Sequence, residues 1–161
     1  MAWFARLMYR ALVWKERQRA RAADKSSPVG PGGGHSGSPA PHLITGRRGE
    51  TLAYWYLRQA GYTIVARNHA SHSGAGELDL VGWDGSTLAF IEVKTRTSEA
   101  AGPPEAAVLP GKQKRIVRTA AEYRRHLKRR DVSYRFDIVS VSWDRAAGYQ
   151  VRLIKNAFQE R

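Results

Sequence analysis

The spacing of apolar residues predicts two helices in the chain beyond residue 46. The segment GRRGETLAYWYLRQAGY has apolar side chains three and four residues apart and reaches Gly61, where a helix C-terminus is expected. A second stretch, from about Gly111 to Arg130, combines an apolar stripe with many basic residues. Both patterns are typical of helices that pack one face on a sheet. The apolar positions are Leu52, Ala53, Tyr56, Leu57 and Ala60, then Ile116, Ala120, Tyr123 and Leu127.

Extended segments rich in β-branched and aromatic residues lie between and after these helices. They are YTIVARN, the two halves of GELDLVGWDGSTLAFIEVKTR, YRFDIVSVSW and YQVRLIK. The predicted order is therefore helix, three strands, helix, two strands. This order predicts a mixed α/β fold with a central sheet flanked by helices.

The predicted hairpin at 76–96 carries charged residues where strands are usually apolar. An Asp-Gly pair at 84–85 favours a two-residue turn, and counting back from it places Glu77 opposite Glu92. Asp79 then lies one step diagonal to Glu92 on the same face. The second strand is apolar on both faces through its first half, so we expect it to be covered on both sides, with Glu92 and Lys94 at its end.

Carboxylates held together in a partly dry place favour a bound cation, a proton or a nearby ammonium group. Asp79, Glu92 and Glu77 offer the hard oxygen ligands that Mg²⁺ or Mn²⁺ accepts. Lys94 is placed to orient a water molecule and to stabilise negative charge in phosphoryl transfer. The alternative interpretation is an ordinary cross-strand ion-pair network on a solvated sheet face, which contributes about 0 to 1 kcal/mol.

The N-terminal part differs in composition from the rest of the chain. Residues 1–24 predict a basic amphipathic helix, residues 25–45 a Gly, Pro and Ser linker, and residues 46–161 the folded domain. The longest apolar run of the first segment is too short to span a bilayer. Contact with an anionic membrane surface stays open for this segment, beside a partly disordered tail.

Charge and cysteine content narrow the function classes. The chain has no cysteine, which excludes disulfides and thiolate metal sites. Its 27 Lys and Arg against 14 Asp and Glu give a net charge of +13, which suits a polyanionic partner. Nine basic residues lie between Gly111 and Arg130, and we expect this helix to follow a nucleic-acid backbone. Its candidate contact residues are Lys112, Gln113, Lys114, Arg115 and Arg118.

The motifs taken together resemble a known bacterial family. Asp79 followed by Glu92-Val93-Lys94 resembles the D…(D/E)-x-K signature of restriction-endonuclease-like nucleases. The longer string GRRGETLA…GELDLV…FIEVKTR…KQKRIVRTA…RFDIVSV is similar to the YraN family, related in fold to Holliday-junction resolvases. The resemblance implies a central mixed sheet flanked by helices, a divalent metal on Asp79 and Glu92, and Lys94 beside the scissile phosphate. Glu50 matches a family glutamate; its alternative role is an acid in the first turn of a helix.

These observations lead to one main hypothesis and two alternatives. We expect a cytoplasmic bacterial metal-dependent endonuclease acting on DNA rather than RNA, with branched or structured DNA suggested by the resolvase resemblance, and a homodimer if the substrate is a two-fold junction. The first alternative is a nucleic-acid-binding module with little turnover, in a repair or ribosome-linked assembly. The second is a membrane-surface adaptor. His69 and His72 are expected to belong to a polar loop, and Asp137 to be structural.

Overall fold

The structure is a computed structural model that describes residues 6–11, 14, 46–96, 108–127, 131–144 and 148–160. Residues 6–11 are helical, in agreement with the helix predicted there. The predicted linker at 25–45 lies outside the described residues, so the linker and the domain boundaries stay predictions. Within the described ranges, no helix combines the length and the apolar character needed to cross a membrane.

The helices and strands beyond residue 46 follow the predicted order. They are α2 (Gly46–Gln59), β1 (Thr63–Ala70), β2 (Glu77–Asp84), β3 (Thr87–Arg96), α3 (Pro110–Arg125), β4 (Tyr134–Asp144) and β5 (Gly148–Phe158). The second helix ends at Arg125, earlier than the predicted end at Arg130. Residues 128–130 lie outside the described ranges.

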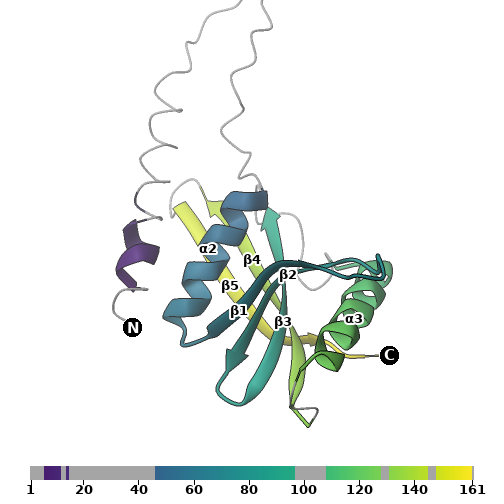
Figure 1. The fold of residues 1–161 in the computed structure, drawn as a ribbon. Helices are drawn as coiled ribbons and strands as arrows, with labels where there is room; N and C mark the ends of the chain where they lie inside the picture. Colours follow the sequence, from purple (N-terminus) through teal and green to yellow (C-terminus); the bar gives the residue numbers. More distant parts are fainter. Residues whose placement is uncertain are drawn as a thin grey trace, which may run out of the picture.

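The five strands form one sheet in the order β1-β2-β3-β4-β5. β3 and β4 are parallel, whereas the other neighbouring pairs are antiparallel. A parallel pair needs a crossover connection, and α3 lies within it. The predicted fold class, a mixed α/β fold with helices flanking a central mixed sheet, is therefore confirmed (Figure 1).

α2 and α3 pack on opposite faces of the sheet. Leu52 and Leu57 of α2 join a buried cluster with Ile91, while Ile116 of α3 joins a second cluster with Phe90. Successive residues of β3 thus enter different cores, and Leu88 to Glu92 are all buried. This confirms that β3 is covered on both sides, and it places the acidic end of β3 at the margin of a dry core.

The predicted hairpin register is wrong by two residues. Asp84 pairs with Thr87, so the turn residues are Gly85 and Ser86. Gly85 has φ of 60°, as the first central position of a type II′ turn requires. Asp84 stays in the strand because its Oδ2 accepts hydrogen bonds from Arg135 Nη2 and Lys155 Nζ, both at 2.6 Å. Charge partners on β4 and β5 therefore help to hold Asp84 in the strand, next to a Gly-Ser pair that itself suits this turn.

Asp137 is a structural carboxylate, as expected. It is fully buried in β4, and Arg135 Nε donates to both of its oxygens at 2.9 and 3.1 Å. Tyr62 Oη donates at 3.2 Å and the backbone N–H of Asn156 at 2.9 Å. Four hydrogen bonds satisfy this buried charge, so it has no capacity left for a ligand.

Candidate active site

β2 and β3 separate where the predicted acidic residues lie. The hydrogen-bonded register runs from Asp84 and Thr87 to Leu80 and Ile91 and stops there. One further step along this register puts Asp79 opposite Glu92. At this point a side chain replaces the backbone as hydrogen-bond acceptor: Asp79 Oδ2 accepts the Val93 N–H at 2.7 Å.

Glu92 is the most buried of the candidate site residues, with 3% of its surface exposed. Its Oε1 forms ion pairs with Lys94 Nζ at 2.9 Å and with Lys112 Nζ at 3.3 Å. Its Oε2 is buried and has no hydrogen-bond partner. A buried carboxylate oxygen without a partner is costly, and a cation bound between Glu92 and Asp79 would relieve that cost.

Asp79 is the titratable group whose environment marks the site. Burial, followed by the negative charge of Glu92, raises its pKa from the ordinary 3.8 to about 6. The Val93 N–H and the charge of Lys112 act in the opposite direction, and Glu50 adds a smaller upward contribution. Strong perturbation of a carboxylate by burial and a second carboxylate is typical of catalytic and metal-binding sites.

Glu50 is held near this pair by the close packing of α2 on β3. Gly49 is buried, and a Cβ atom placed on it would lie 2.0 Å from Thr95 Oγ1. Only glycine therefore allows this approach of helix to strand. α2 begins at Gly46 and its first turn holds no acid, so the alternative role of Glu50 as a first-turn acid is wrong.

Glu77 stands apart from the pair. It is exposed at the start of β2 and pairs across the sheet with Ala70. Among the described residues, no set of three acidic or histidine side chains is close enough to form a metal site. The donor set that the fold brings together is therefore Asp79 and Glu92. Two carboxylates fit Mg²⁺ or Mn²⁺, because Mg²⁺ retains several waters and binds through one or two carboxylates.

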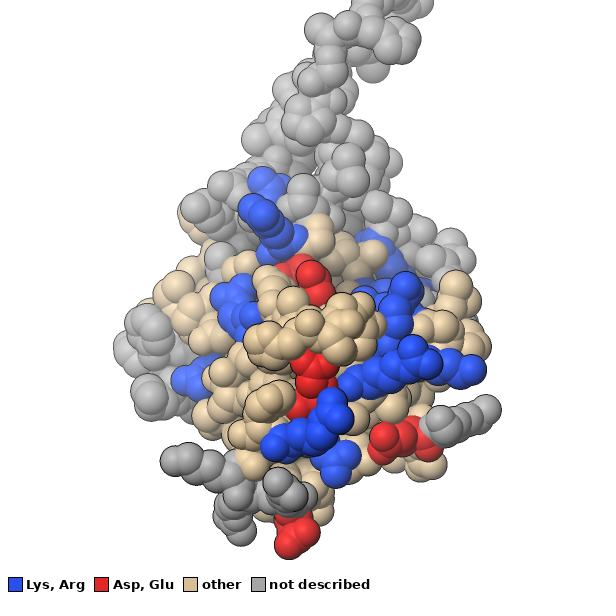
Figure 2. All heavy atoms as spheres, turned by 45° about the vertical axis from the view of Figure 1, so that its right-hand side comes forward, with Lys and Arg blue, Asp and Glu red and all other residues tan. Residues whose placement is uncertain are grey.

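The basic helix begins at this site. Lys112 in its first turn binds Glu92, and Gln113 donates from Nε2 to the carbonyl oxygen of Val108 at 2.9 Å. Lys114, Arg115 and Arg118 are exposed along α3. Figure 2, which turns the α3 side of the molecule forward, shows Lys and Arg side chains around small, separate acidic patches. The predicted contact residues therefore divide into one lysine at the acidic pair, one structural glutamine and an exposed basic row.

Glu122 is a functional candidate that sequence reasoning missed. It is buried in α3, and its carboxylate accepts hydrogen bonds from Ser71 Oγ at 2.5 Å, His72 N–H at 2.7 Å and Ser73 Oγ at 2.7 Å. The Ser71 and Ser73 bonds lower its pKa to about 2. It is the one acid among the nine basic residues of Gly111–Arg130, and this contrast in the sequence could have marked it as a candidate. His72 lies in the loop after β1, as expected. His69 was expected in the same polar loop, but it lies in β1 opposite Leu78, and its ring packs edge-on against Tyr123.

The string of motifs that surrounds the acidic pair matches a family model. The model of Uncharacterised protein family UPF0102 covers residues 49–141, from the glycine before Glu50 to the middle of β4. The chain belongs to this family. The match confirms the resemblance to the YraN family stated from the sequence motifs.

Individual UPF0102 proteins from several bacteria are similar to this chain. One from Solibacter usitatus is 57% identical over 99 residues, which is 60% of this chain and 73% of the relative. One from Koribacter versatilis is 48% identical over 117 residues, 73% of this chain and 80% of the relative. One from Syntrophus aciditrophicus is 40% identical over 118 residues, 73% of this chain and 91% of the relative. Their names state family membership and no activity.

Proposed function

We propose that the chain is a metal-dependent endonuclease that hydrolyses phosphodiester bonds in DNA. The observation that supports this most is the buried Oε2 of Glu92, which has no hydrogen-bond partner. The neighbouring carboxylate, Asp79, has a raised pKa, and the other oxygen of Glu92 forms an ion pair with Lys94. This combination offers one open position for a cation and one ammonium group within reach of its ligands. Both are needed where negative charge develops on a phosphate.

Asp79 and Glu92 are the residues that hold the metal in this proposal. Mg²⁺ or Mn²⁺, when bound, neutralises phosphate charge and lowers the pKa of a coordinated water. The Val93 N–H fixes one oxygen of Asp79, so the orientation of this ligand is set before binding. Glu50 adds negative charge near the pair, and Glu77 is too exposed to contribute more than long-range attraction for the cation.

Lys94 orients the attacking water in this proposal. Its ammonium group is 2.9 Å from Glu92 Oε1 and keeps 27% of its side-chain surface exposed, so it faces both the carboxylate and the solvent. The water oxygen forms a bond to phosphorus while the bond from phosphorus to the leaving sugar oxygen breaks. The water gives its proton to solvent, and the leaving oxygen takes one up. Lys112, on the same Glu92 oxygen, stabilises the added negative charge.

The exposed basic row of α3 supports a nucleic-acid substrate. Arg115 and Arg118 lie along the helix from Lys112, where a phosphate backbone leaving the acidic pair meets them. DNA, and branched DNA in particular, is proposed on the resemblance to resolvases.

One observation favours a second candidate, a nucleic-acid-binding module with little turnover. Glu92 Oε1 already carries two ammonium groups, which neutralise much of the charge that attracts a cation. In this alternative, Lys94 and Lys112 bind the nucleic acid, and Asp79 and Glu92 have a structural role.

A cleavage assay separates the two candidates. Purified protein is incubated with end-labelled linear, flapped and four-way DNA in Mg²⁺, in Mn²⁺ and in EDTA. The proposal expects metal-dependent cuts that fall by at least about 100-fold in both Asp79→Asn and Lys94→Ala. Asp131→Asn and Arg58→Ala, which lie outside the site, serve as matched controls. Binding without cuts on every substrate supports the module, and cleavage that persists in Lys94→Ala refutes the assignment of Lys94 to the attacking water.

A further inference from the structure

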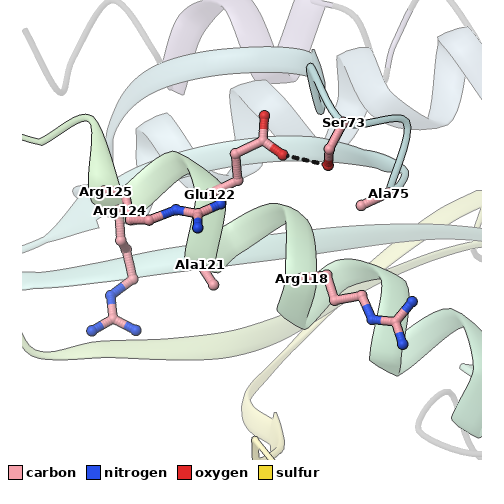
Figure 3. Close-up of a pocket in the computed structure, with 7 residues that line it drawn as sticks. All are labelled: Ser73, Ala75, Arg118, Ala121, Glu122, Arg124 and Arg125. Carbon is pink, nitrogen blue, oxygen red and sulfur yellow. Dashed lines mark hydrogen bonds between the residues drawn. The ribbon is translucent and has the colours of Figure 1, made fainter.

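A pocket separate from the acidic pair lies on the outer side of α3 (Figure 3). Its volume is about 710 Å³, and it is bordered by α3 and by the loop at 71–76 that leads into β2. Three of its lining residues are arginines, whose side chains leave the helix in different directions around the pocket. The lining residues are Ser73, Ala75, Arg118, Ala121, Glu122, Arg124 and Arg125.

The loop wall of this pocket is held in place by Glu122. Both oxygens of that carboxylate are used by the loop, through two serine hydroxyls and one backbone N–H. Within the loop, Ser71 Oγ also accepts the N–H groups of Ser73 and Ala75, at 3.1 and 3.2 Å. These bonds fix the wall before any ligand arrives, which lowers the entropy cost of binding.

The pocket carries an excess of positive charge. Arg118 and Arg125 are exposed, and neither forms an ion pair with another described residue. Arg124 is held 3.5 Å above the ring of Tyr134. Glu122 is the one acid in the lining, and its oxygens face neutral donors rather than these guanidinium groups. Two unpaired guanidinium groups beside a fixed wall match the planar, multi-donor recognition of phosphate by arginine.

Both elements that border the pocket, α3 and the loop at 71–76, lead along the chain to the acidic pair. α3 begins with Lys112 at Glu92 and reaches Arg118 after about 9 Å and Arg125 after about 20 Å, at about 1.5 Å per residue. Arg115 bridges the interval, and its side chain lies against Gly76, where a Cβ atom would be 3.3 Å from that of Arg115. The loop continues into β2 and reaches Asp79 three residues after Gly76.

We propose that this pocket binds backbone phosphates of the DNA strand that enters the acidic pair, with Arg118 and Arg125 at different points along that strand. The inference rests on the function proposed above. At about 3.4 Å per nucleotide along a duplex, a strand that follows α3 reaches the pocket about three to six nucleotides from the bond at the acidic pair. The pocket is thus a second anchoring point that sets the path of the strand, whatever its sequence.

The test is a binding measurement under conditions that prevent cleavage. Fluorescence anisotropy with a labelled duplex is recorded in EDTA over a series of KCl concentrations. The double variant Arg118→Ala/Arg125→Ala is compared with Arg58→Ala/Arg67→Ala, which removes the same charge from the α2 side of the sheet. We expect the first variant to bind at least about tenfold more weakly at low salt than the second. Its plot of log K against log salt should be shallower by about 0.9 for each phosphate that the variant no longer neutralises.

The outcomes separate this inference from the proposed function. Equal affinity and equal salt slope in the two variants overturn the pocket assignment, as does a wild-type chain that binds no duplex at low salt. A cleavage assay that fails while Arg118→Ala/Arg125→Ala still loses affinity refutes the nuclease and leaves the phosphate pocket in place. Arg67, Arg118 and Arg125 are exposed and Arg58 is half-buried, and unchanged thermal midpoints in both variants show that folding is intact.

Discussion

Removing the charge of Asp79 should make the protein more stable at neutral pH. Asp79 sits beside Glu92 in a partly dry place, so its ionised form is disfavoured in the folded chain. Asparagine has nearly the same shape, and its side-chain oxygen can still accept the Val93 N–H that Asp79 binds at 2.7 Å. The substitution Asp79→Asn therefore removes the repulsion between Asp79 and Glu92, and it keeps the hydrogen bond to Val93 at the end of the β2–β3 pairing.

The size and sign of the effect follow from the pKa of Asp79. Its value of about 6 in the folded chain, against an ordinary 3.8, corresponds to about 3 kcal/mol of destabilisation when the group is ionised. Between these two values the folded state binds more protons than the unfolded state, so the stability due to this group falls as the pH rises. The cost is complete above about pH 7 and absent below about pH 4. Burial of the amide offsets part of the gain, which leaves about 1 to 3 kcal/mol.

Urea denaturation measures this difference directly. The free energies of unfolding of the wild-type chain and of Asp79→Asn are compared at several pH values from about 4.5 to 8, in EDTA so that no divalent cation neutralises the pair. We expect the variant to gain stability over the wild type as the pH rises. Asp131→Asn, at an exposed position, is the matched control and should show no such trend. A variant that is equally or less stable at every pH refutes the reasoning.

Two further substitutions test how the site is supported. Gly49→Ala should lower the free energy of unfolding by about 1 to 3 kcal/mol, since its Cβ would meet Thr95 Oγ1 at 2.0 Å; Gly111→Ala, with open space around it, is the control, and equal urea midpoints would contradict the packing argument. Glu122→Gln should speed amide hydrogen exchange over residues 71–76 at neutral pH. The wild-type loop should loosen only as the pH falls from about 4.5 toward about 2, where this carboxylate is protonated, and unchanged exchange would count against its role.

The order of elements could be predicted because each depends on local patterns. The helical spacing that includes Leu52 and Leu57, and the two-sided apolar pattern of β3, describe which faces must be buried, and burial is what the structure shows. The end of α3 could not be placed as well. Its basic residues continue past Arg125 to Arg130 without a change in composition, so the sequence had no clear stop signal there.

The candidate site was predicted only in part, because its geometry depends on contacts between distant segments. The convergence of Asp79, Glu92 and Lys94 was inferred from alternation along two strands and from an Asp84-Gly85 turn. The structure brings these residues together, but through a different turn and register. The sequence predicted that Lys112 contacts a nucleic-acid phosphate, and it could not show that Lys112 also pairs with Glu92, because Glu92 lies on a different element, β3. The same holds for Glu122, whose three donors lie in a loop about 50 residues earlier in the chain.

The hairpin turn has a consequence for how this protein is made. Asp84 is kept in its strand by Arg135 and Lys155, which lie 51 and 71 residues further along the chain. Until those residues have been synthesised, the local sequence allows either Asp84-Gly85 or Gly85-Ser86 as the turn, and with the first Glu77 rather than Asp79 opposes Glu92. We therefore expect the alignment of the acidic pair to be fixed only after β4 and β5 have been synthesised, and a chain cut short before β5 lacks one of the two charges that hold Asp84 in its strand.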